Sequence, residues 1–242
     1  MTINCFWEHN GNDTLLYATE DIGAYSRGAS LAEAVKKMPA EIASYLRWAG
    51  APPAEGMEIV LVGEKASDLA IRDADSDAIF ETEKAPLTRA EYECLKALAL
   101  CSAEDFLALY ASVPDKNAVA SPPRKTFYGR VPRSAEEMYA HTKSVNAYYF
   151  AEIGVDADNS GSILDCRKRG FEALEKTPDF LQNAVFEGSY GELWSLRKVL
   201  RRFLWHDRIH ARAMYRMAVK IFGAENVENP FCFSETINEE KQ

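Results

Sequence analysis

The chain has 242 residues, of which 47% are hydrophobic and 27% are charged, and its formal net charge at pH 7 is −9. This composition is typical of a globular protein with a buried core, and it excludes a disordered chain. The acidic balance opposes nucleic acid as the main partner, because a phosphate backbone is neutralised by basic side chains.

The hydropathy pattern and the N-terminus predict a cytoplasmic protein. No run of eighteen apolar residues occurs, so no membrane-spanning helix and no membrane partner are expected. Residues 1–5 lack the basic and apolar regions of a secretory signal. The five cysteines are scattered without a CxxC pair, which predicts neither a disulfide framework nor a cysteine zinc site. Cys94 and Cys101 are one heptad apart in a helical stretch, and we expect both in the core.

Residues 1–84 predict a small α+β module. Strands are expected over residues 3–7, 24–26, 58–63 and 78–81. Ser30 and Glu33 have the spacing of a capping box and begin a helix that ends before Gly50, with Pro39 expected to kink or interrupt it. This order resembles the β-α-β-β half of HicB-like proteins, a fold seen in antitoxins, which implies binding of another protein or regulation of nucleic acid.

Residues 87–225 predict an all-α four-helix bundle, so that the fold class is α+β. Four helix starts are predicted, each by a Ser or Thr that is followed three residues later by an acidic residue. The four pairs are Thr88 and Glu91, Ser134 and Glu137, Ser162 and Asp165, and Ser189 and Glu192. The last helix is expected over about residues 191–222. The long connection over residues 114–133 is either a crossover or a lid, and residues 226–242 form a C-terminal tail.

Three of the four histidines fall on the expected inward faces of helices. His206 and His210 are four residues apart, so their imidazoles share one face of a helix, as two ligands of one metal would. His141 lies between Met138 and Val145 on the inward face of an earlier helix. The alternative is a set of core histidines that hydrogen-bond to their neighbours. A shared cation would remove the cost of burying three unpaired imidazoles.

The run Leu204-Trp205-His206-Asp207-Arg208-Ile209-His210-Ala211-Arg212 resembles the H-x3-H segment of DinB-like proteins, and Glu136-Glu137-Met138-Tyr139-Ala140-His141 resembles the segment that carries their first histidine. The superfamily includes YfiT-like proteins and low-molecular-weight-thiol transferases. The resemblance covers residues 87–223 and implies a four-helix bundle with a metal on His141, His206 and His210. The N-terminal module and the short interval between His141 and His206 depart from the usual plan of this family.

Three neutral imidazoles leave a coordination position open, as in catalytic zinc sites. A metal with an open position lowers the pKa of a water or thiol that it binds. The resemblance implies a metal-dependent hydrolase or thiol transferase with a small-molecule or thiol substrate, and zinc or nickel is the expected metal. The alternative is a non-catalytic interaction or regulatory protein with a structural metal.

Four further residues are candidates for supporting a metal site. Asp207 is expected either to accept a hydrogen bond from a metal-binding imidazole or to form a surface salt bridge with Arg208 or Arg212. Arg208 and Arg212 belong to a basic face that is expected to be solvated, or else to bind an anionic substrate. Glu187 is a candidate acid at the mouth of the site. A homodimer through the helices is a further expectation.

Overall fold

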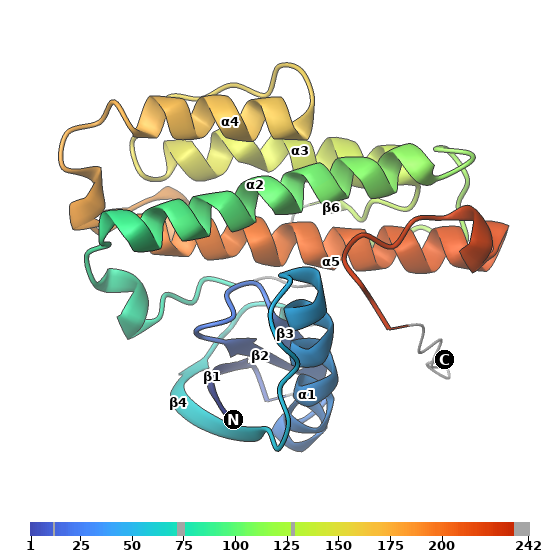
Figure 1. Ribbon diagram of the computed structural model, residues 1–242, viewed down its shortest axis with the longest axis horizontal. Coiled ribbons are helices and arrows are strands. Elements are labelled where there is room, and N and C mark those ends of the chain that lie inside the picture. Colours follow the sequence, from blue (N-terminus) through green and yellow to red (C-terminus); the bar gives the residue numbers. More distant parts are fainter. Residues whose placement is uncertain (12, 72–75, 127–128, 235–242) are drawn as a thin grey trace.

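The computed structural model describes residues 1–11, 13–71, 76–126 and 129–234 and shows a mixed α+β protein. A small sheet with one helix comes first in the chain, and four further helices run side by side along one side of it (Figure 1). Among the described residues, no helix is long and apolar enough to cross a membrane.

The N-terminal sheet has the strand order β3-β2-β1-β4. Its strands are β1 (Thr2–His9), β2 (Thr14–Ala18), β3 (Tyr25–Gly28) and β4 (Glu58–Ala66). β1 is antiparallel to β2 and parallel to β4, and helix α1 (Leu31–Trp48) makes the crossover to β4. Ser30 caps α1 as predicted, whereas Pro39 lies inside the helix without ending it.

The helical part contains α2 (Arg89–Ser112), α3 (Ala135–Ala151), α4 (Ile163–Leu174) and α5 (Leu196–Phe222). Both α5 and α4 pack against α2 and α3. The short elements are β5 (Lys125–Thr126), β6 (Gly129–Arg130), β7 (Phe186–Glu187) and β8 (Leu193–Trp194), with the 3-10 turns η2 (Glu81–Lys84), η3 (Phe180–Gln182), η4 (Ser189–Gly191) and η5 (Ala224–Asn226).

Three of the four predicted helix starts are confirmed, since Thr88, Ser134 and Ser162 each accept a hydrogen bond from the backbone N–H three residues on. The fourth is wrong: Ser195, not Ser189, caps α5. The Glu192 carboxylate lies 2.8 Å from the Lys198 Nζ instead of returning to Ser189.

The sheet and the helices share one core. Trp205 of α5 lies against Tyr17 and Tyr25 of the sheet, with ring centroids 5.9 and 6.5 Å apart. Phe231 and Phe233, in the part expected to be a tail, are buried, and Phe231 stacks on Trp48 of α1 at 5.7 Å. The N-terminal sheet and α1 therefore bury apolar surface against the helical part and the segment that follows it.

Two local expectations are wrong. The expected strand at 78–81 does not form: residues 78–80 are irregular and η2 begins at Glu81, because the Glu83 carboxylate accepts a hydrogen bond from the Phe80 N–H and ion-pairs with Arg201. Cys94 and Cys101 are exposed, because the buried face of α2 carries Tyr92, Ala99, Phe106 and their neighbours.

Replacement of Gly23 by Ala is expected to destabilise the protein strongly. Gly23 has a φ of +96°, and a Cβ there would lie 2.5 Å from the Leu204 Cβ. Strain and overpacking together predict a loss of about 2–4 kcal/mol of unfolding free energy in a urea titration. Gly50→Ala is the matched control, because Gly50 has a φ of +66° but no atom within 4 Å of a built Cβ. Equal losses in the two variants would contradict the close approach of the sheet and α5.

Candidate metal centre

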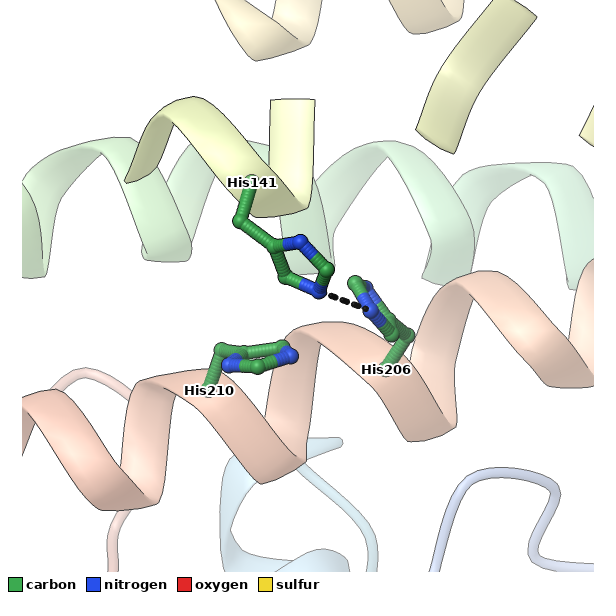
Figure 2. A group of neighbouring side chains, drawn as sticks. All are labelled: His141, His206 and His210. Carbon is green, nitrogen blue, oxygen red and sulfur yellow. Dashed lines mark hydrogen bonds between the residues drawn. The ribbon is translucent and has the colours of Figure 1, made fainter. Parts of the chain in front are cut away.

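Three histidines from two helices converge at one point between α3 and α5 (Figure 2). His141 comes from α3, and His206 and His210 lie one turn apart on α5. One ligand nitrogen from each lies within 4.8 Å of the other two. The ring centroids are 5.1 Å apart for His141 and His206, 4.7 Å apart for His141 and His210, and 4.5 Å apart for His206 and His210.

Local structure explains how the three side chains meet. Ser134 begins α3 two turns before His141, and the four-residue spacing on α5 places His206 and His210 on the same face. Tyr149, farther along α3, packs edge-on against His206 with ring centroids 6.1 Å apart. His206 is only 9% exposed, whereas His141 and His210 are half-buried. The cluster is thus anchored on its buried side and reaches solvent on the other.

The spacing of the nitrogens fits a divalent ion. The Nε2 atoms of His141 and His206 are 3.2 Å apart. Two imidazole nitrogens bound to one tetrahedral zinc, each 2.0–2.1 Å from it, would lie about 3.3–3.4 Å apart. The three ligand atoms span up to 4.8 Å, so a side chain would move inward to complete the set. The Nδ1 atom of His206 is buried without a hydrogen-bond partner among the described residues.

All three imidazoles are held in the neutral form that binds metals. Burial lowers the pKa of His141. Burial, and then the neighbouring His141, lower the pKa of His210 to about 3. The pKa of His206 is lowered well below its usual value by burial, by the other two histidines and by two nearby arginines, Arg202 and Arg167. Neutral imidazoles keep a free lone pair at neutral pH, which is the ligand form.

Asp207 lies inside the helical part and not beside the histidines. It is fully buried and accepts two hydrogen bonds from Arg167, at 2.5 and 3.1 Å, and one from the Ser102 hydroxyl at 2.7 Å. The expected surface salt bridge is therefore wrong. No described contact joins this carboxylate to an imidazole, so its role as an acceptor for a metal-binding histidine stays a prediction.

The other candidate residues also lie outside the cluster. Arg208 and Arg212 both ion-pair with Glu41 of α1. Arg208 is fully buried, so the expectation that this basic face is solvated is wrong at its first member. Glu187 is exposed in β7. The two arginines thus join the helical part to α1, because their long side chains reach the one buried carboxylate on that helix.

The sequence patterns did not identify Arg202 as a neighbour of the cluster. Arg202, His206 and His210 repeat every four residues along α5, and this spacing was the available signal. The guanidinium of Arg202 lies over the rings of Trp194 and Trp205, at 5.4 and 5.0 Å from their centroids. A cation is therefore fixed about one turn from His206.

Comparison with protein-family models finds no match to this chain, and comparisons with curated proteins and with solved structures also find none.

The unfolding free energy of the metal-free protein is expected to fall as the pH drops from about 7 to about 5. The imidazoles of His206 and His210 remain neutral in the folded state, whereas the unfolded chain takes up protons near the usual value of 6.5. The contribution of these neutral imidazoles to the unfolding free energy is thus complete above pH 6.5, and it is lost as the pH falls towards their folded-state pKa. A urea titration in chelator should show a shallower pH slope for His210→Gln, by up to about 1.4 kcal/mol per pH unit. Identical slopes would contradict the burial of this imidazole.

Removal of the Asp207 carboxylate is expected to destabilise the protein by about 3–5 kcal/mol, because Arg167 would keep a buried charge without its partner. Asp207→Ala is compared by urea titration with Asp158→Ala, which removes the exposed partner of Arg169. The exposed pair is screened by solvent, so its loss should leave stability near that of the wild type. A small effect at Asp207 would show that the buried ion pair does not hold the helices together.

Proposed function

We propose that this chain is a divalent-metal-binding protein of the DinB-like kind, in which α2, α3, α4 and α5 form a four-helix bundle. His141, His206 and His210 hold the metal, zinc or nickel, and leave one coordination position open. The observation that carries the proposal is the 3.2 Å separation of the Nε2 atoms of His141 and His206 within a cluster of three imidazoles from two helices.

The three imidazoles are better suited to binding a metal than to packing in the core without one. Two neutral imidazoles that face each other through Nε2 share at most one hydrogen bond, and only when one of them carries its proton there. Burying three such groups without full hydrogen bonding is costly, and a shared cation makes all three useful as ligands. The pairing of two ligands one turn apart with a third from a neighbouring helix also gives a rigid site.

The charges around the cluster favour an anionic group at the open position. Three neutral imidazoles leave the full charge of a divalent ion uncompensated. Arg167 is paired with Asp207, and Arg202 and Lys198 share Glu192, so neither carboxylate is free to compensate the ion. A divalent ion with an open position lowers the pKa of a bound water or thiol, and this environment favours a thiolate or another anion. We therefore propose that the metal activates a bound thiol or water, for thiol transfer or hydrolysis.

Stoichiometric metal in the purified protein is the expected result of elemental mass spectrometry after dialysis. The triple variant His141→Ala, His206→Ala, His210→Ala should contain none, because all three ligands are lost. His9→Ala is the matched control, since His9 lies in β1 and pairs with Glu64 far from the cluster. Metal retained by the triple variant, or lost equally by the control, would contradict the site.

Cobalt substitution separates an open site from a sealed one. Added small thiol should bind the cobalt-loaded protein and produce a sulfur-to-cobalt charge-transfer band, because the proposed site has a free position. An unchanged spectrum together with stoichiometric cobalt would instead support the non-catalytic interpretation, a structural metal in an interaction protein.

A further inference from the structure

The outer edge of β4 is one of the two edges of the N-terminal sheet, and the middle of this strand is apolar. β4 pairs with β1 on one side only, and no described strand lies beyond it (Figure 1). Three consecutive residues of β4 are exposed, Val60 to 37%, Leu61 to 43% and Val62 to 53%. An unpaired strand edge with exposed apolar side chains is a template for pairing with another strand.

The backbone of β4 offers hydrogen-bonding groups along this edge. The Glu58 N–H donates to the Met1 carbonyl and the Ser67 N–H donates to the His9 carbonyl, so both point towards β1. Successive residues of a strand direct their N–H and C=O groups to opposite edges. Ile59 is one residue after Glu58, and Glu64 is three residues before Ser67. The backbone N–H and C=O groups of Ile59 and Glu64 therefore point outward, away from β1.

A bulge in β4 changes which side chains share a face of the sheet. Leu61 pairs with Cys5 of β1, but Gly63 pairs with the next residue, Phe6, so that Val62 is the extra residue. As a result Glu58, opposite Thr2, and Lys65, opposite Glu8, lie on the same face of the sheet although seven residues separate them. In a regular strand they would lie on opposite faces.

We infer that the β4 edge pairs with the β4 edge of a second copy of this chain, antiparallel about a two-fold axis between Leu61 and Val62. In this register Leu61 lies opposite the partner's Val62, and Ile59 lies opposite the partner's Glu64, so that outward-pointing backbone groups meet. Glu58 lies opposite the partner's Lys65 at both ends of the interface, on the same face. Two central apolar pairs and two outer opposite-charge pairs then flank the axis.

Charge and the bulge together select this register. A shift by one residue would place opposed side chains on different faces of the joined sheet. A shift by two residues would place Leu61 opposite Glu64 and remove the pairs between Glu58 and Lys65. The Lys65 side chain is 35% exposed while it contacts Asp77, so it remains able to reach a second carboxylate. The inference rests on β4 alone and is independent of the metal centre.

The test is the mass of the full-length protein in solution, measured by sedimentation equilibrium across the micromolar range. The wild type, whose chain mass is 27.1 kDa, is expected to dimerise. Val62→Lys places two like charges beside the axis and should raise the dimer dissociation constant at least about tenfold. Val119→Lys is the matched control, because Val119 is 47% exposed outside the sheet, and it should leave the dissociation constant unchanged.

A second variant tests the register. Glu58→Lys would oppose the partner's Lys65 and should weaken the dimer, whereas Glu55→Lys, just before the strand, should not. Circular dichroism of each variant checks that it is folded. A monomeric wild type at every concentration, or a dimer that Val62→Lys and Glu58→Lys leave intact, would overturn the inference.

Discussion

The buried ion pair between Arg167 and Asp207 is the interaction on which the arrangement of the helical part depends. Arg167 of α4 also donates to the Asn146 carboxamide of α3 and to the Ala99 carbonyl of α2, and Ser102 of α2 donates to Asp207. One guanidinium thus joins α4 to α2, α3 and α5, and each of its hydrogen bonds has a specific direction. A fully buried ion pair is tolerated only when hydrogen bonds of this kind satisfy both of its partners. The network therefore fixes α5 in a single orientation about its own axis.

That rotation determines what each face of α5 does. With Asp207 turned to the interior, His206 before it faces α3 and His141, and Arg208 after it reaches Glu41 of α1. Trp205 packs against the sheet. Four consecutive side chains therefore meet four different surroundings, because successive residues of a helix are about 100° apart. The histidine cluster and the contact between the sheet and the helices follow from the same placement of one helix.

Much of this architecture is readable from local sequence, and the failures have physical causes. Hydroxyl caps predicted four helix starts, and the four-residue spacing of His206 and His210 predicted their shared face. β2 was missed because it is buried along its whole length and lacks the alternation of a half-buried strand. The partners of Asp207 were also unpredictable, since Arg167 lies forty residues away and no local pattern links them. Long-range ion pairs are decided by packing and not by spacing.

X-ray absorption spectroscopy of the metal-loaded protein tests directly whether the three histidines hold the metal. We expect three imidazole nitrogens at about 2.0–2.1 Å from the ion and one light-atom ligand from solvent, which an added thiol replaces with sulfur. Sulfur from the protein itself before any thiol is added, or fewer than three imidazoles, would contradict a site built on His141, His206 and His210.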